Sequence, residues 1–258
     1  MSTHYCANCR RGNPPKAHYC LHCGQAMHQH RIDAHFIWHE LQHGLLHVDK
    51  GIFFTIKELA LQPGRTVREF LAGRRTAHFK PVTLLLLAAG TYTLLRHFAP
   101  EALIQEPDHD TATFQGLTVG RWLNNHLAWF WLLMGPLVAW AIQRLFRRFA
   151  DFNLYEVLVL VLYLTGETFV LLTATLPVRL LLPATPYGHT PWYYYPCLAY
   201  LLWGIWQFYE VALPRPWPRL GRAVAGMLLA AVLFALVLLV VLLIALLTGV
   251  LHAPEAGH

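Results

Sequence analysis

Charged residues are scarce in this sequence. Of its 258 residues only 13% are Asp, Glu, Lys or Arg, whereas 56% are apolar and 13% are aromatic. Folded globular domains carry about 25% charged residues on average. So little charge excludes an intrinsically disordered chain, because disorder requires many charges and few apolar residues. It also argues against an ordinary soluble domain and directs attention to a membrane protein.

Five stretches of the sequence are apolar enough to cross a bilayer, which takes about 20 mostly apolar residues. They cover residues 81–99, 127–146, 154–176, 192–213 and 223–251. The last has no charged residue, which is unusual for a soluble helical bundle, the alternative interpretation. The first is the weakest, because Arg96 and His97 interrupt its end. The sequence therefore predicts an all-α integral membrane protein with a domain of five transmembrane helices in residues 81–258.

The distribution of basic residues predicts how the chain lies in the membrane. No apolar signal segment occurs among the first 30 residues, so the first span is expected to direct insertion. With the N-terminus in the cytoplasm, 17 of the 20 Lys and Arg residues lie inside, and the exceptions are Arg96, Arg121 and Arg179. Membrane proteins keep their basic residues on the cytoplasmic side. We therefore expect a multi-pass protein of a bacterial inner membrane, with its N-terminus in the cytoplasm and its C-terminus outside.

Four of the five cysteines form two pairs near the N-terminus. The pairs are Cys6-x2-Cys9 and Cys20-x2-Cys23, with a turn at Asn13-Pro14-Pro15 between them. Two thiolates at this spacing can hold one ion from a tight turn, and two such turns complete a tetrahedral zinc site. A closed site has no open position, so the zinc is expected to be structural. The redox alternative requires a βαβ pattern that the sequence lacks. Residues 1–30 are thus predicted to form a zinc-ribbon-like head.

Histidines recur every four residues after the head, so that on a helix they share one face. They are His35, His39, His43 and His47. Such a face can be simply solvated or can bind a metal ion. The letters at 39–43 also match His-Glu-x-x-His, in which Glu40 would be the general base of a zinc peptidase. The third ligand that a peptidase needs could come from His47 or Asp49, but both follow His43 more closely than the third ligand of such a peptidase usually does.

Residues 31–80 are predicted to form amphipathic cytoplasmic helices at the membrane surface. Two short helices are expected over residues 52–61 and 65–72, the second bracketed by Pro63 and Gly73. Basic residues follow up to the first span, namely Arg65, Arg68, Arg74, Arg75 and Lys80. We expect them to contact anionic lipid head groups. Nucleic acid is not expected, because closeness to the membrane already explains the positive charge.

The order of these features resembles a known family. The matching residues include Cys6-Ala-Asn-Cys9, Tyr19 to Gln25, His47 to Gly51, Thr55, Leu59, Pro63-Gly64, Arg68-Glu69, Gly73 to Arg75 and Lys80-Pro81. Over about residues 5–85 the chain is similar to the bacterial domain-of-unknown-function family 3667. The resemblance implies a cysteine-pair head and a basic juxtamembrane block on a multi-pass membrane protein, with no known activity. Arg10 departs from the pattern, because a glycine able to adopt positive φ often stands there.

Carboxyl groups inside the predicted spans are the remaining candidates for chemistry. Glu156 and Glu167 share a face of the third span, and Glu210 lies near the inner end of the fourth. Such a group marks an ion or proton path, or else ties helices together in protonated form. The leading hypothesis is a non-enzymatic adaptor or regulator whose head recruits an unknown cytoplasmic protein. The alternative is a small transporter or channel built on Glu167, and the third is a membrane metallopeptidase.

Overall fold

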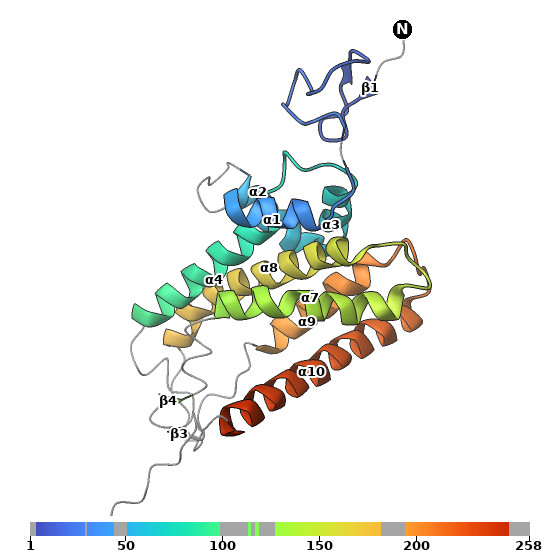
Figure 1. Cartoon of the computed structure of the whole chain (residues 1–258). Coiled ribbons are helices and arrows are strands. Elements are labelled where there is room, and N and C mark those ends of the chain that lie inside the picture. Colours follow the sequence, from blue (N-terminus) through green and yellow to red (C-terminus); the bar gives the residue numbers. More distant parts are fainter. Residues whose placement is uncertain are drawn as a thin grey trace, which may run out of the picture.

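The structure, a computed structural model, places a small head on one end of a helical bundle (Figure 1). It describes residues 4–28, 30–43, 51–98, 113–114, 117–118, 127–181 and 194–247. Within them the chain is mostly helical, as the composition predicts. The elements are, in order, β1 (His4–Tyr5), β2 (Gly12–Asn13), α1 (Ala34–His43), α2 (Ile52–Leu61), α3 (Pro63–Leu71), α4 (Pro81–Phe98), β3 (Thr113–Phe114), β4 (Leu117–Thr118), α7 (Leu127–Phe146), α8 (Leu154–Leu181), α9 (Tyr194–Phe208) and α10 (Pro216–Leu247).

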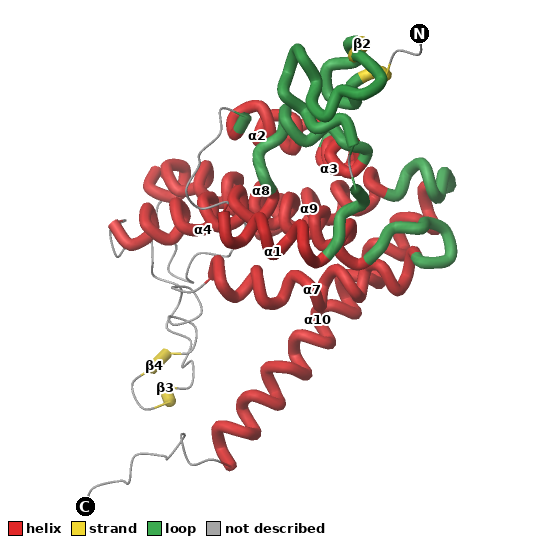
Figure 2. Tube along the Cα trace, turned by 45° about the horizontal axis from the view of Figure 1, so that its top comes forward, coloured by secondary structure: helices red, strands yellow, loops and turns green. Residues whose placement is uncertain are grey.

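The head is built from two short hairpin-like turns and no helix. Strands β1 and β2 pair antiparallel, with Tyr5 opposite Gly12. A single bridge between Tyr19 and Ala26 closes the second turn in the same manner. Tubes in Figure 2 show these loops standing apart from the helices of the bundle. Helices α1 to α3 lie between the head and the bundle.

Two short helices form where the sequence predicts them. Helix α2 ends at Leu61 and α3 begins at Pro63, with only Gln62 between them. Proline suits the first position of a helix, because the N–H that it lacks would have no partner there. The chain leaves α3 through Gly73, which has a φ of 109°.

Helix α8 forms the centre of the bundle. Within its apolar stretch Leu154–Val178, the most apolar 18-residue window is 72% buried. Helix α4 packs along α8, and the rings of Tyr92 and Phe169 lie 5.9 Å apart between them. Helices α7 and α9 also pack on α8. The core of the protein therefore surrounds α8.

The prediction of five spans is supported only in part. Among the described residues, two helices are long and apolar enough to cross a membrane, Leu154–Val178 in α8 and Pro216–Val237 in α10. Helix α7 contributes a shorter apolar stretch, Leu132–Phe146. Helix α4 has 18 residues and ends in a turn that carries Arg96 and His97. The sequence therefore locates the apolar helices correctly, but fewer of them than predicted are, within the described residues, long and apolar enough to cross a membrane by themselves.

Three helices begin or end several residues away from the limits of the spans predicted over them. Helix α9 has 15 residues and stops at Phe208, so residues 209–212 form turns where the prediction places helix. Helix α8 continues through Pro177 to Leu181. Helix α10 begins at Pro216, seven residues before the predicted span, and so includes Arg219 and Arg222. Proline is well suited to the first position of a helix, whereas the prediction begins the span only after the last charged residue.

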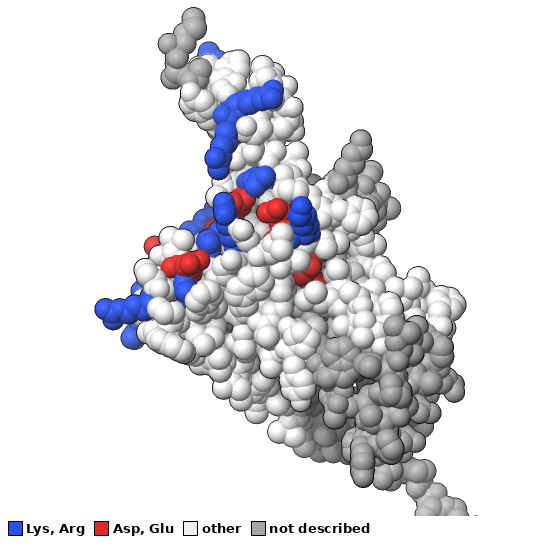
Figure 3. Space-filling model, turned by 180° about the vertical axis from the view of Figure 1, so that it is seen from behind, with Lys and Arg blue, Asp and Glu red and all other residues white. Residues whose placement is uncertain are grey.

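Helix α10 exposes apolar residues over most of its length. Only 17% of its apolar stretch is buried. Exposed side chains recur every four residues along one face, at Val224, Leu228, Val232, Leu236 and Val240. On the face shown in Figure 3, charged side chains gather at the head end, and the described surface away from it carries none. This separation of charge from apolar surface is typical of a protein that sits in a bilayer.

Candidate metal centre and its attachment

The four paired cysteines converge on one point in the head. Their sulfur atoms all lie within 4.8 Å of one another. The Sγ atoms of Cys6 and Cys23 are 3.6 Å apart, and those of Cys9 and Cys20 are 3.5 Å apart. A tetrahedral zinc ion with Zn–S bonds of about 2.3 Å requires sulfurs about 3.8 Å apart. The four thiols, which form no disulfide, can therefore hold one metal ion.

Each cysteine pair lies on the same kind of turn. In the first turn the N–H of Arg10 donates to the Cys6 carbonyl at 2.9 Å, and in the second Gly24 donates to the Cys20 carbonyl at 2.9 Å. The φ angles of Arg10 and Gly24 are 59° and 71°. Arg10 therefore adopts the left-handed conformation that the resemblance assigns to glycine. A residue with a side chain is disfavoured there by roughly 1–2 kcal/mol.

The side chain of Asn13 joins the two turns. It is buried, and its Nδ2 donates to the Arg11 carbonyl at 2.9 Å. Its Oδ1 accepts from the N–H of Leu21 at 2.9 Å, and Nδ2 also lies 3.5 Å from the Cys20 sulfur. Sequence reasoning places Asn13 in a turn and misses this role, because no short motif signals a contact between the two turns.

The surroundings of Cys20 favour its thiolate. Desolvation alone would raise its pKa, but hydrogen bonds from the N–H groups of His22 and Cys23 and from the Asn13 side chain outweigh it. The pKa of Cys20 falls to about 6 as a result. A thiolate is the form that binds metal, so this cysteine is ready to do so at neutral pH.

The head is fixed to the loop that follows α3. Gln25 is buried, and its Oε1 accepts hydrogen bonds from the N–H of Thr76 at 2.8 Å and from the Thr76 hydroxyl at 2.5 Å. Nearby, Arg75 donates to the His30 carbonyl at 2.9 Å.

The linker after the head is fixed to the loop between α7 and α8. The Arg31 guanidinium donates to both oxygens of Glu156, at 2.7 and 2.8 Å, and to the Asp151 carbonyl. The hydrogen bond with Glu156 raises the pKa of Arg31. Ile32 is buried, and its carbonyl accepts from Asn153 at 2.8 Å. Glu156, one of the predicted intramembrane carboxylates, is thus an ion-pair partner of the linker.

The histidine row divides between described and undescribed residues. His35 and His39 are exposed on α1, with ring centroids 6.2 Å apart. His43 ends the helix, and His47 lies outside the described residues. In the part of the chain whose side chains are described, the cysteines form the one group of three or more ligands close enough for an ion.

Glu40 points away from the exposed histidine face. It is 2% exposed, and its Oε1 accepts from the N–H of Val82 at 3.3 Å, in the first turn of α4. The first N–H groups of a helix have no partner inside it, so Glu40 caps α4. Burial raises the pKa of Glu40 to about 8, although the Val82 N–H and the charge of Lys80 oppose the rise. The geometry therefore gives Glu40 a structural role, and it lends no support to a peptidase.

Several residues of the basic juxtamembrane block have partners inside the protein. Arg68 donates to the carbonyls of Gln207 and Phe208, the latter at 2.9 Å, and so caps the end of α9. Burial lowers the pKa of Arg68. Arg74 pairs with Glu69 at 2.6 Å. These side chains therefore hold α3 to the bundle and to its own loop, a use that the sequence does not reveal.

Close contacts also hold α2 and α3 against the bundle. A Cβ atom on Gly64 would lie 2.2 Å from the Phe208 backbone nitrogen, so only glycine fits where α3 meets α9. Tyr200 of α9 donates to the Leu59 carbonyl at 3.1 Å. Thr55 is buried and accepts from the N–H of Phe79 at 2.7 Å.

Glu167 lies in the core of the bundle. It is buried in α8, and its Oε2 has no hydrogen-bond partner among the described residues. Tyr163, one turn earlier, donates to the Phe79 carbonyl at 2.6 Å. Glu210 is exposed at the end of α9. Of the three predicted intramembrane carboxylates, Glu167 alone is buried without an ion pair among the described residues.

Comparison with known proteins finds a match for one segment of the chain. Residues 49–93 match the family model described as "protein of unknown function (DUF3667)". The match covers α2, α3 and most of α4, including Thr55, Gly64 and Arg68, and it confirms the resemblance over this segment. The cysteine pairs lie outside it. No curated protein and no solved structure matches the chain.

The two positive φ angles predict opposite effects of two substitutions. Arg10→Gly should tighten metal binding and Gly24→Ala should weaken it, each by about fivefold, because about 1 kcal/mol of backbone strain is removed or added. No atom lies within 4 Å of a Cβ on Gly24, so the effect there is one of backbone alone. Chelator competition on the full chain in detergent measures both, with exposed Lys16→Ala as control. Equal affinities in all variants would contradict the strained turn.

The burial of Glu40 predicts a specific pH dependence of stability. Its pKa is about 8 in the folded chain and about 4.5 in the unfolded chain, so the protonated form favours folding. This contribution is complete below about pH 4.5, declines as the pH rises and is lost above about pH 8. Glu40→Gln keeps an acceptor for Val82 but cannot ionise, so its stability should not decline in this window.

Thermal unfolding in detergent, scanned from pH 5 to 9, measures this difference, with Glu210→Gln as the exposed control. Parallel profiles for wild type and Glu40→Gln would contradict the buried cap. A peptidase activity that Glu40→Gln abolishes, with no change in the stability profile, would restore the catalytic interpretation.

Proposed function

We propose that the chain is a multi-pass membrane protein whose zinc-holding head presents a binding surface to a cytoplasmic protein. Charge supports the placement in the membrane. Arg219 and Arg222, near the start of α10, lie over Trp206 of α9 and over Phe149 just after α7, and Arg219 is close enough to Arg68 of α3 to affect its charge. Helix α10 carries no charged residue beyond Arg222. A bilayer accepts the exposed apolar face of α10 and excludes the charged end.

In this proposal five helices, α4 and α7 to α10, enter the apolar layer together. Helices too short to span alone can do so inside a bundle, where the bilayer thins or neighbouring residues reach its surface. The head and α1 to α3 then lie in the cytoplasm and the C-terminus lies outside, in a bacterial inner membrane. Exposed Phe53 and Leu61 on α2 suit contact with lipid, and exposed Arg65 suits an anionic head group.

Zinc in this proposal has a structural role. Four thiolates around one ion leave no position for a substrate or water, so the ion supplies no reaction. Its effect is to hold two turns together in a head too small to fold around an apolar core.

The observation that carries the proposal is an exposed apolar surface on the head. Tyr5, Tyr19 and Leu21 are 73%, 65% and 75% exposed. Tyr5 and Tyr19 stand at equivalent positions, one residue before each cysteine pair. Tyrosine is enriched where protein partners bind most strongly, because it combines apolar area with a hydrogen-bonding group. We name these three residues the head surface, and propose that it binds the partner.

A photocrosslinking amino acid in place of Tyr19 tests this function in native membranes. We expect it to capture one cytoplasmic protein, and the same probe at Tyr5 to capture the same protein. Leu21→Asp should lower the yield at least tenfold without loss of metal, because it charges the surface and leaves the thiols intact. Lys16→Asp is the matched control on the same head and should leave the yield unchanged.

Replacement of Cys9 and Cys23 by serine should remove both the metal and the capture while membrane insertion persists. An unchanged capture after the cysteine or Leu21 substitutions would contradict the proposal.

A second candidate function is a small transporter or channel built on Glu167. Its support is the buried carboxyl group with one oxygen that has no partner among the described residues. Buried carboxyl groups in membrane helices often mark ion or proton paths. Proton or ion flux in proteoliposomes that Glu167→Gln leaves unaltered would remove this candidate.

A further inference from the structure

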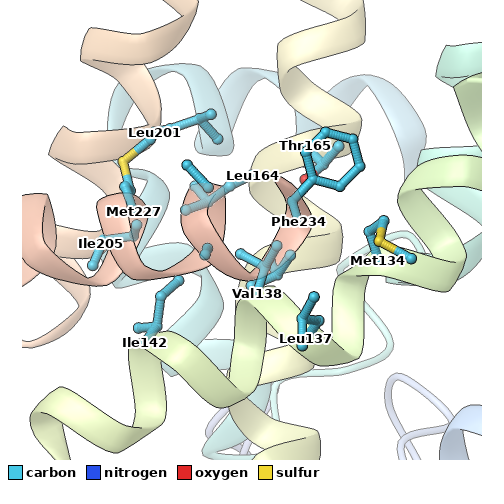
Figure 4. Close-up of a pocket in the computed structure, with 13 residues that line it drawn as sticks. Met134, Leu137, Val138, Ile142, Leu164, Thr165, Leu201, Ile205, Met227 and Phe234 are labelled. Atoms are coloured by element: carbon cyan, nitrogen blue, oxygen red, sulfur yellow. The ribbon is translucent and has the colours of Figure 1, made fainter. Parts of the chain in front are cut away.

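Two cavities adjoin inside the bundle. One, of about 390 Å³, lies between α7, α8, α9 and α10 (Figure 4). The other, of about 400 Å³, lies between α4, α8 and α9. Thr165 of α8 and Leu201 of α9 line both of them. These two side chains therefore lie at the boundary between the two spaces.

The lining of the first cavity is apolar apart from one hydroxyl group, and the lining of the second is mixed. Thr165 is the one polar residue among those that line the first cavity. The second adds hydroxyl groups, of which Thr168 already donates to the Leu164 carbonyl at 2.8 Å. No charged side chain among the described residues lines either cavity. A buried water needs two to four polar partners, so the first cavity suits an apolar occupant and not water.

The size of the first cavity excludes a helix from a second copy. A helix with its side chains is about 10–12 Å wide, so a volume of 390 Å³ holds only about one turn of it. The volume does fall within the range of about 300–1,000 Å³ that is usual for small-molecule sites. A single hydrocarbon chain is narrow enough to enter.

The first cavity adjoins the exposed face of α10. Figure 2 shows this helix pointing away from the other helices toward its C-terminal end. Its residues Met227, Ala231 and Phe234 line the cavity, and the neighbouring Leu228 and Val232 are exposed. In the proposed membrane placement those exposed residues contact lipid. A chain from the bilayer therefore needs to pass only α10 to reach the cavity.

We propose that these two cavities bind one acyl chain of a bilayer phospholipid, which enters beside α10 and continues past Thr165 and Leu201. The site thus takes a hydrocarbon ligand and holds α10 to the bundle through it. This inference rests on the proposed membrane placement and is independent of the partner of the head.

The full chain, reconstituted in phosphatidylcholine vesicles that contain a lipid with a diazirine on one acyl chain, tests the site. After irradiation, mass spectrometry locates the label. We expect label on Met134 and Met227 inside the cavity as well as on the outer face of α10. Ala231→Trp fills the cavity from α10 and should lower the inner label at least fivefold. Ala225→Trp, an exposed alanine of the same helix outside the lining, should leave it unchanged.

A second variant keeps the test decisive if Ala231→Trp does not fold. Leu201→Phe narrows the junction and should remove label from Cys197, which is buried and lines the second cavity, while Met134 remains labelled. Label confined to the outer face of α10, an inner label that neither variant changes, or crosslinks between copies at Met227 would overturn the site. Loss of all label together with loss of the protein from the vesicles would overturn the membrane placement itself.

Discussion

The convergence of four thiols on one point is the constraint on which the head depends. Within residues 4–28 the fully buried apolar side chains are Cys6 and Cys20, so the head has almost no apolar core. Chains of this size need a metal, a disulfide or a partner to fold. Sulfurs 3.5–3.6 Å apart cannot all ionise without a cation between them. We therefore expect metal binding and folding of the head to be one equilibrium, in which the exposed tyrosines keep their positions only while the bound state is favoured.

The head is held to the bundle by contacts at two separate loops. Gln25 reaches the loop after α3, and Arg31 reaches the first turn of α8 through Glu156 and the loop before it through the Asp151 carbonyl. The ion pair is partly exposed and so is modest in energy, but the buried Gln25 and Ile32 add contacts that solvent does not weaken. Between the head and the bundle, side chains also make such contacts between distant segments: Glu40 caps the start of α4, and Arg68 caps the end of α9. Side chains that satisfy helix ends thus join α1 and α3 to the bundle.

The sequence predicts the parts of this structure that depend on local pattern. Spacing alone identifies the four thiols, and Pro63 and Gly73 bracket α3 correctly. Contacts between distant segments decide the rest. The letters around Glu40 match a peptidase motif, yet packing against α4 buries its carboxyl group while His39 stays exposed.

The helix limits differ from the predicted span limits for a related reason, because hydropathy ignores where the backbone turns. Helix α9 stops at Phe208, where Arg68 caps it, although apolar residues continue beyond. Arg10 adopts a positive φ that its side chain disfavours, because the turn that carries Cys6 and Cys9 requires it. Neither the end of α9 nor the φ angle of Arg10 can be predicted from amino-acid composition or from the periodicity of apolar residues.

X-ray absorption at the zinc edge on the purified full chain tests the central claim most directly. One equivalent of zinc with four sulfur ligands at about 2.3 Å is the predicted result, because all four sulfur atoms already lie within 4.8 Å of one another. A shell that contains imidazole nitrogen or water, or a chain that folds with no bound metal, would contradict the account.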